Sequence, residues 1–222
     1  MFAFCKKQHS GGAYAQVDMV YHKLRESIIQ LQLPLGSKLN VNELQARMGV
    51  SCTPIREAIN RLQQEGLVVY ENNVGAHIIS LAPHDVLEIQ QLAMTLHAAA
   101  IHLAMVNGDR ATIVAELRKQ LEDYTNAKTE HDEVMAVKEF LGTYYHNCGN
   151  HRLDQHMLAI QGQQTLLRYI FASCVPQRAA DTAVFQRMLL DTINGDADSV
   201  CDMLQKYTDH MTLIVESAVT EM

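Results

Sequence analysis

The stretch MGVSCTPIREAINRLQQEGLVVYENNVGAHII, from Met48 to Ile79, decides the fold. Gly49 follows a short segment with helical spacing, and glycine readily adopts the left-handed conformation that ends a helix in a tight turn. Pro54 suits the first turn of the next helix, where its missing amide hydrogen has no bond to lose. Apolar residues then recur every three or four positions from Ile55 to Leu62, which predicts a helix with one buried stripe.

Two short β-branched segments follow that helix and predict a hairpin. "LVVY" and "AHIIS" flank "ENNVG", whose asparagines and glycine tolerate positive φ. Upstream, the periodicity predicts a helix from Val17 to Leu31 and a short helix from Val41 to Met48. The order helix, helix, tight turn, helix, hairpin is that of a winged helix-turn-helix, whose third helix fits the DNA major groove.

The third helix of this unit carries hydrogen-bond donors opposite its buried stripe. The residues expected on that face are Thr53, Arg56, Asn60 and Arg61. Such side chains can contact bases or phosphates. Structural interpretations compete with this one: the hydroxyl of Ser51 or Thr53 can cap the helix, worth about 1 kcal/mol, and an exposed arginine can simply be solvated.

The rest of the chain has helical periodicity throughout. After a junction "LAPHD", helices are expected at about 84–106, 110–127, 131–147, 151–173, 178–194 and 197–220, with short connections that favour antiparallel packing. We therefore predict a mainly α protein. It has a flexible leader over 1–14, a winged helix-turn-helix over 15–81, and an all-helical effector-binding and dimerisation domain, an antiparallel six- to seven-helix bundle, over 82–222.

The net charge of −7 hides an uneven distribution. Residues 1–80 carry eight Lys and Arg against six Asp and Glu, whereas the remaining residues carry ten against nineteen. The acidity of the whole chain therefore does not exclude a nucleic-acid partner for the first part.

Cysteine usage and hydropathy predict the compartment. Five scattered cysteines without a Cys-x-x-Cys pair are typical of a protein with reduced thiols. We expect no apolar run to reach the roughly 20 residues of a membrane helix. The N-terminal "MFAFCKKQHSGG" lacks a signal-peptide pattern. We expect a soluble, cytoplasmic protein with no membrane partner.

Catalytic motifs are missing from the sequence. It contains no Gly-x-Ser-x-Gly, no phosphate loop and no His-Glu-x-x-His. We therefore expect no enzyme and no cofactor. His146, His151 and His156 lie five apart, which spreads them around a helix rather than along one face. Ordinary histidines are the favoured interpretation, and a metal site at such non-standard positions stays open as the alternative.

The segment "VSCTPIREAINRLQQEGLV" resembles the usual "VSRTPVREALRRLEAEGLV" of GntR-family transcription regulators, in the FadR-like branch with an all-helical ligand domain. The resemblance implies that Arg56 is a principal DNA contact. It adds Ser51, Thr53 and Gly75, at the wing tip, as further candidates. Cys52 stands where relatives usually have a DNA-contacting arginine, so that contact is expected to be lost or shifted.

The helical part resembles the family more loosely, through "EFLGTYYHNCGNHRL" and "FQRMLLDTINGD". Many relatives bind a metal through one Asp and three His, and the resemblance places Val137, Leu141, Gln186 and Tyr207 at those positions. The usual metal site is therefore expected to be lost. The arginine and glutamate of the first ligand-domain helix align with Ala93 and His97, which implies a less charged, aromatic effector pocket. Its expected lining is His97, Leu141, Gln186, Tyr207 and Tyr144 or Tyr145, with Tyr145 preferred.

The function expected from these features is sequence-specific regulation of transcription. A homodimer would bind double-stranded DNA at a near-palindromic operator, because one module reads only a few base pairs. A small-molecule effector would change operator affinity by binding two arrangements unequally, and repression is the commoner mode in the family. The alternatives are a metabolite-binding or enzymatic helical protein with a vestigial DNA-binding module, and a regulator that no longer responds to an effector.

Overall fold

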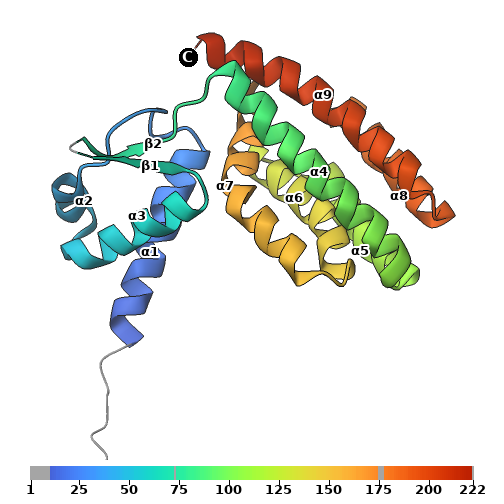
Figure 1. Ribbon diagram of the computed structural model, residues 1–222, viewed down its shortest axis with the longest axis horizontal. Coiled ribbons are helices and arrows are strands. Elements are labelled where there is room, and N and C mark those ends of the chain that lie inside the picture. The colour runs from blue at the N-terminus through green and yellow to red at the C-terminus, as the bar shows by residue number, and fades with distance from the viewer. Residues whose placement is uncertain (1–10, 73, 175–177, 222) are drawn as a thin grey trace, which may run out of the picture. The chain divides into compact units, whose positions relative to one another are not determined.

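The computed structural model describes residues 11–72, 74–174 and 178–221 (Figure 1). The chain divides into two compact units, Met1–Ser80 and Leu81–Met222. Helices dominate both units, and the only sheet among the described residues is a two-stranded hairpin. The mainly α fold class, with a winged helix-turn-helix followed by a helical bundle, is confirmed.

The described residues of the first unit form three helices and a hairpin. They are α1 (Gly11–Ile29), α2 (Val41–Met48), α3 (Cys52–Gln64), β1 (Val68–Glu71) and β2 (Gly75–Ile78). Helix α1 begins inside the predicted leader of residues 1–14, of which residues 1–10 lie outside the described part of the chain. It also ends two residues before the predicted Leu31, which adopts a positive φ of 56°.

The core of this unit lies between α1 and α3. Val20, Leu24 and Ile28 of α1 are buried, as are the α3 residues of the predicted stripe, and the two helices pack against each other. Gly49 ends α2 with a φ of 66°, as predicted. The predicted cap is wrong: Ser51 occupies the N-cap position of α3, but no side-chain cap hydrogen bond forms there.

Three polar contacts join α1 to the C-terminal part of α3 and its C-cap residue, Glu65. Tyr21 and Arg25 both donate to the carboxylate of Glu65, and the Arg25 Nε–Glu65 Oε2 distance is 2.8 Å. Nearby, Arg61 Nη1 lies 2.6 Å from Asp18 Oδ1. The Arg61 guanidinium also stacks over the Tyr21 ring, 3.9 Å from its centroid. Burial and the neighbouring Glu65 raise the pKa of Tyr21 to about 12, so its hydroxyl remains a donor.

The hairpin pairs β1 and β2 antiparallel, with Val68 opposite Ile78 and Glu71 opposite Gly75. Val68, Ala76 and Ile78 are buried, while Val69 and Tyr70 are exposed. An isolated bridge pairs Lys38 with His77 and brings the segment before α2 alongside β2.

The second unit contains six described helices. They are α4 (Pro83–Asn107), α5 (Arg110–Asn126), α6 (Glu130–Asn147), α7 (His151–Cys174), α8 (Arg178–Asn194) and α9 (Ala197–Glu221). The predicted bounds of these helices differ by one residue at most. Helix α4 packs against α6, α7 and α9, and α5 packs against α6 and α8. A cluster of aromatic rings that includes Phe140, Phe185 and Tyr207 fills the centre.

One expectation about hydropathy is wrong. Helix α4 is long and apolar enough, by length and composition, to cross a membrane, although no such run was expected. In the structure its apolar residues Val86, Ala93, Ala100 and Ile101 are buried against neighbouring helices of the same unit. The helices that form the core of a soluble protein satisfy the same test of length and composition.

The contact between Arg25 and Glu65 yields a first prediction. The substitution Arg25→Ala should lower the opening free energy of α1 and α3 by roughly 1–2 kcal/mol, because Glu65 loses a charged hydrogen-bond donor. Amide hydrogen exchange of the full-length protein should then be roughly 5- to 30-fold faster in these two helices. Lys23→Ala, at an exposed position of α1, is the control. Equal protection in both variants would show that the contact contributes nothing to stability.

Candidate functional site

A groove in the first unit lies between α3 and the hairpin, with a volume of about 640 Å³. Three of the six predicted DNA-binding residues, Arg56, Asn60 and Gly75, line it. Arg56 and Asn60 are exposed and lie one helical turn apart, so both point away from the buried stripe of α3. The groove therefore presents a guanidinium and a side-chain amide on one face of the helix.

Four further polar residues of the groove were missed by the sequence analysis. Lys38, Asn40, Gln63 and Tyr70 also line it. Gln63 falls on the same helical face as Arg56 and Asn60, and outward-facing Tyr70 is 59% exposed, so local periodicity carried a signal for both. Lys38 had no local signal, because the bridge to His77 brings it to the hairpin.

Gly75 has a structural reason to be glycine. Its φ is 107°, a conformation that residues with a side chain rarely adopt; space is not the reason, since an added Cβ would make only an ordinary 3.7 Å contact with Lys38 Cε. The neighbouring residue 73 of the predicted turn lies outside the described residues.

Two other predicted contacts lie at the start of α3. Ser51 and Thr53 are exposed but do not line the groove. Since the Ser51 side chain accepts no hydrogen bond from the helix, it does not satisfy the first amides of α3. A helix N-terminus with free amides carries partial positive charge.

The structure places Arg61 differently from the prediction. It lies five positions after Arg56, about 140° around the helix axis, and therefore faces α1. There it pairs with Asp18 and stacks on Tyr21. Arg61 thus belongs to the contact between α1 and α3 and is absent from the groove.

Cys52 begins the third helix and is partly buried. Its Sγ donates to Gln45 Oε1 of α2 at 3.3 Å. The thiol therefore connects the two helices of the helix-turn-helix, at the position where an arginine contact to DNA was expected to be missing.

The second unit contains a cavity of about 230 Å³ between α4, α6 and α7. His97, Leu141 and Tyr145, three of the five predicted effector contacts, line it. His97 Nδ1 and the Tyr145 hydroxyl share a hydrogen bond of 3.1 Å. The side chains that complete the cavity are Lys138, Glu139, His146, Asp154, Met157, Leu158, Gln161, Gln164 and Arg168, with Gly142.

The other residues predicted for this pocket lie elsewhere. Gln186 is exposed on α8, and Tyr207 is buried against the rings of Phe171 and Phe185. Tyr144, the alternative to Tyr145, donates or accepts a hydrogen bond of 2.8 Å with Thr192. None of the three lines the cavity. These residues lie on α8, α9 and α6, helices that contribute to the core of the unit, but their side chains point away from the cavity. The resemblance to the family did not predict the direction of each side chain.

Arg168 of α7 is the cavity residue that the sequence analysis missed. It is 6% exposed, and its Nε has no hydrogen-bond partner in the described part of the chain. Burial lowers the pKa of Arg168, and the groups that act on its charge are the hydroxyls of Tyr207 and Tyr145. The signal was a single arginine within the apolar run "TLLRYIF". The expectation of a less charged pocket is therefore wrong at this position.

His97 is neutral in this environment. Burial, reinforced by the Arg168 charge, lowers the pKa of His97 to about 3. Burial also raises the pKa of Tyr145, although the same arginine opposes that rise. The pair His97–Tyr145 therefore offers neutral hydrogen-bonding groups beside the guanidinium.

The metal site of the resembling family does not fit these residues. Val137 and Leu141 are buried hydrocarbon side chains, Gln186 is exposed, and Tyr207 carries a neutral hydroxyl because burial raises its pKa. Metal ligands are normally imidazole, thiolate or carboxylate groups. Among the residues described, no three His, Cys, Asp or Glu side chains are grouped to hold an ion.

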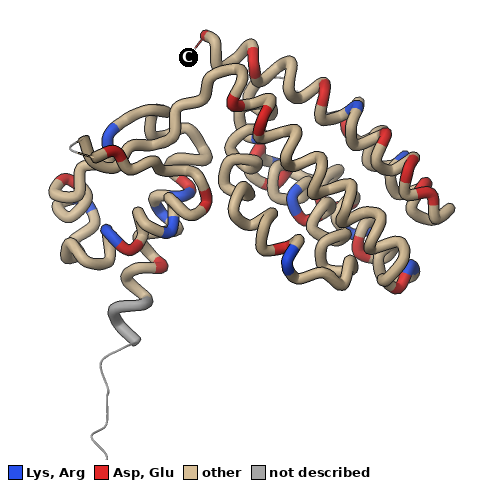
Figure 2. The backbone as a smooth tube through the Cα atoms, in the orientation of Figure 1, with Lys and Arg blue, Asp and Glu red and all other residues tan. Residues whose placement is uncertain are grey.

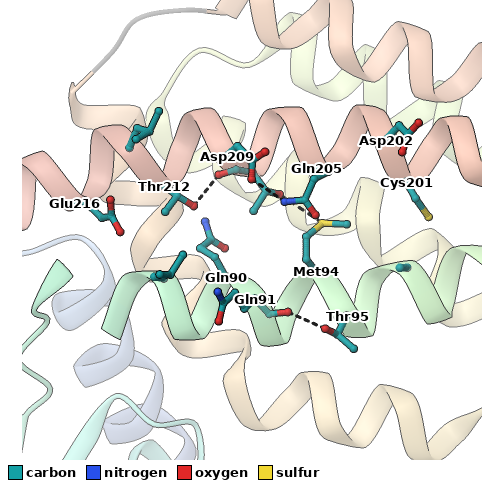
Figure 3. Close-up of a pocket in the computed structure, with 14 residues that line it drawn as sticks. Gln90, Gln91, Met94, Thr95, Cys201, Asp202, Gln205, Asp209, Thr212 and Glu216 are labelled. Carbon is teal, nitrogen blue, oxygen red and sulfur yellow. Dashed lines mark hydrogen bonds between the residues drawn. The ribbon is translucent and has the colours of Figure 1, made fainter. Parts of the chain in front are cut away.

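A larger and more open groove of about 800 Å³ lies between α4 and α9. Figure 3 shows Gln90, Gln91, Met94 and Thr95 of α4 facing a row of polar residues on α9. Asp and Glu recur along α9 in Figure 2 as well. Gln164 of the cavity donates to Gln90 Oε1 at 2.9 Å, so one hydrogen-bonded pair connects the two concavities.

Comparison with known proteins gives concordant matches. The family model "Bacterial regulatory proteins, gntR family" matches residues 16–78. An uncharacterized HTH-type transcriptional regulator of Agrobacterium vitis is 35% identical over 119 residues, 53% of this chain and 70% of that protein. Another from Streptomyces ambofaciens is 37% identical over 102 residues, 46% of this chain, and the match spans only 43% of that relative.

A solved structure titled "E. coli McbR/YncC" has the same fold. It superimposes with a TM-score of 0.75 at 17% identity, and the match covers 91% of this chain and 97% of that one. The likeness extends over both units, whereas the family model ends before the helical unit.

The lowered pKa of His97 yields a second prediction. Between its folded value of about 3 and its ordinary value of 6.5, the unfolded state binds a proton that the folded state does not, so stability falls as the pH falls through this range. From pH 7 to pH 5 the wild type should lose about 2 kcal/mol more than His97→Gln, at 1.36 kcal/mol per pKa unit.

Urea unfolding followed by the helical circular dichroism signal measures this difference. His156→Gln, at an exposed position of α7, should keep the wild-type pH dependence. If His97→Gln showed the same loss as the wild type, His97 would be protonated normally in the folded protein.

Proposed function

Because the chain belongs to the GntR family of bacterial regulatory proteins, we propose that it represses transcription as a homodimer whose operator affinity a small effector controls. Membership of the family makes it a helix-turn-helix transcriptional regulator that binds DNA. Beyond the family, we propose repression, the dimer, the effector and the roles of individual residues. Such a protein acts on DNA in the cytoplasm and has no catalytic role.

The observation that supports DNA reading is the groove between α3 and the hairpin. Arg56 and Asn60 are exposed there, together with Lys38, Gln63 and Tyr70. In the major groove an arginine can bind guanine O6 and N7 together, and an asparagine can bind adenine N6 and N7. We assign base contacts to Arg56 and Asn60, and backbone contacts to Ser51, Thr53 and the hairpin around Gly75. Arg61 is left out because it is paired with Asp18.

The expected symmetry of the operator follows from the small number of base pairs that one helix-turn-helix can contact. One α3 and one hairpin contact only a few base pairs, and two copies related by two-fold symmetry place their recognition helices about 34 Å apart, one turn of DNA. We assign dimerisation to the helical unit and expect a near-palindromic operator.

The effector site in this proposal is the cavity of the helical unit. It is lined by residues of α4, α6 and α7. The ligand would act by binding one arrangement of the dimer more tightly than another, since equal affinity would shift nothing. His97, Tyr145 and Leu141 are the contacts that we assign to it.

Selection of bound duplexes from a random DNA library with the purified protein tests the proposal. The wild type should enrich an inverted repeat. Arg56→Ala should weaken binding to it by about 1–3 kcal/mol, roughly 5- to 150-fold, and relax the preference at one base pair in each half-site. Arg118→Ala, an exposed arginine of α5 in the other unit, should leave affinity unchanged.

Two outcomes would contradict parts of the proposal. Unchanged affinity of Arg56→Ala would remove Arg56 from the reading surface. If a folded dimer enriched no sequence, with or without cell metabolites, the helix-turn-helix would be vestigial, and the chain would instead be a metabolite-binding protein.

A further inference from the structure

We propose that the ligand of the cavity is a small organic monoanion, a carboxylate, whose charge is neutralised by Arg168 without a metal ion. Calling this ligand the effector rests on the proposed function. The anion site itself rests on the geometry of the second unit.

The first argument is the missing counter-charge of Arg168. Its guanidinium is buried, forms no ion pair among the described residues, and has an Nε without a partner. Among the described residues, the groups that act on its charge are the neutral hydroxyls of Tyr207 and Tyr145. The residues outside the described part, 1–10, 73, 175–177 and 222, include no Asp or Glu. A buried charge without compensation is strongly unfavourable, so an anionic ligand would supply what the chain does not.

The second argument concerns the acidic residues of the cavity. Glu139 and Asp154 both line it, but Glu139 pairs with Lys138 at 3.1 Å. Asp154 acts on Tyr145, whose pKa it helps to raise, and is not among the groups that act on Arg168. Among the residues that the structure describes, the cavity therefore has one unpaired cation, Arg168, and one carboxylate without a cation partner, Asp154. This balance favours a ligand with a single negative charge, because Asp154 would repel a second negative charge on the ligand.

The third argument is the composition of the walls. His97 and Tyr145 are neutral hydrogen-bonding groups beside the guanidinium. Leu141, Met157 and Leu158 offer hydrocarbon contacts. The volume of about 230 Å³ lies below the roughly 300–1,000 Å³ of pockets for drug-sized molecules. A carboxylate on a short aliphatic chain or a single ring fits this description.

Water is the competing occupant, because it would hydrate Arg168 without neutralising it. The two cases differ in their response to charge. A water-filled cavity gives no preference for carboxylates over neutral molecules of the same shape, whereas an anion site distinguishes them sharply.

Thermal unfolding of the full-length protein provides the test. The probes are acetate, propionate and benzoate, each compared with its amide (acetamide, propionamide or benzamide) at constant ionic strength. The proteins are the wild type, Arg168→Met, Arg168→Lys and Arg152→Met, the last an exposed arginine on the same helix.

At least one carboxylate should raise the Tm of the wild type saturably, and no amide should do so. Arg152→Met should respond like the wild type. Arg168→Met should show no response, and without anion its Tm should be at least that of the wild type, because the buried charge is gone. Arg168→Lys keeps the charge but loses the two-pronged donor, so half-saturation should require roughly 10- to 100-fold more ligand.

The proposal is overturned if no carboxylate stabilises the wild type, or if amides stabilise it equally. An unaltered carboxylate response in Arg168→Met would also overturn it. If Arg168→Met does not fold, the comparison of Arg168→Lys with Arg152→Met decides, because a response equal to the wild type would exclude Arg168 from the site.

The same solutions separate this inference from the proposed function. The stabilising carboxylate should change operator affinity in the wild type but not in Arg168→Met. Stabilisation through Arg168 with unchanged operator affinity would keep the anion site and remove the effector role. A protein that bound no DNA would contradict the proposed function, while the unfolding data would still decide the anion site.

Discussion

The packing of α3 against α1 determines what the first unit can present to a partner. Ile55, Ala58, Ile59 and Leu62 are all buried, and with this stripe fixed every other residue of α3 has a defined direction. Arg56 and Asn60 point into the groove beside the hairpin. Glu65 and Arg61 point back to α1, where they meet Arg25 and Asp18. The direction of the side chains in the groove therefore depends on apolar contacts on the opposite side of the helix.

Arg168 differs from the arginines that form ion pairs, which occur in both units, as Arg187 with Asp191 in the second shows. In the first unit, Arg25 and Arg61 have carboxylate partners and retain some access to solvent. In the second unit, Arg168 is almost completely buried without such a partner. A folded chain keeps an unpaired charge in its interior only if other interactions outweigh the desolvation. This difference matches the roles that we propose. Arg25 and Arg61 hold helices together, and their charges are neutralised by carboxylates of the same chain. Arg168 would bind a ligand, and its charge is left for that ligand to neutralise.

Much of the fold was predictable because it follows from local patterns. Apolar spacing defined the helices of the second unit to within one residue, and glycine and proline marked the turn before α3. The same stretch predicted Arg56 and Gly75 as DNA contacts, and the structure places both in the groove between α3 and the hairpin. These features depend on side chains close together in sequence, so a single sequence contains them.

The errors share a different origin, the contacts between distant segments. Arg61 was assigned to DNA because its partner Asp18 lies forty-three positions away in α1. Lys38 reaches the groove only through its bridge to His77. Gln186 was placed in the pocket by alignment, yet the rotation of α8 exposes it. Arg168 was overlooked because its role depends on its having no ion-pair partner among the described residues, although Glu139 and Asp154 line the same cavity.

The internal pairing of arginines in the first unit also bears on how DNA binding responds to the ionic medium. Each phosphate that a protein cation neutralises releases condensed counterions, and this release makes affinity fall as salt rises. Of the six Lys and Arg residues described in this unit, Arg25 and Arg61 are already paired. Cys52 replaces a further cation of the family pattern. If the described residues provide the DNA contacts, so few free cations release few counterions per protomer, and base-edge contacts and two-fold repetition would contribute most of the binding free energy. Such a protein would remain bound to its operator when the ionic strength of the cell rises enough to release more basic DNA-binding proteins from DNA.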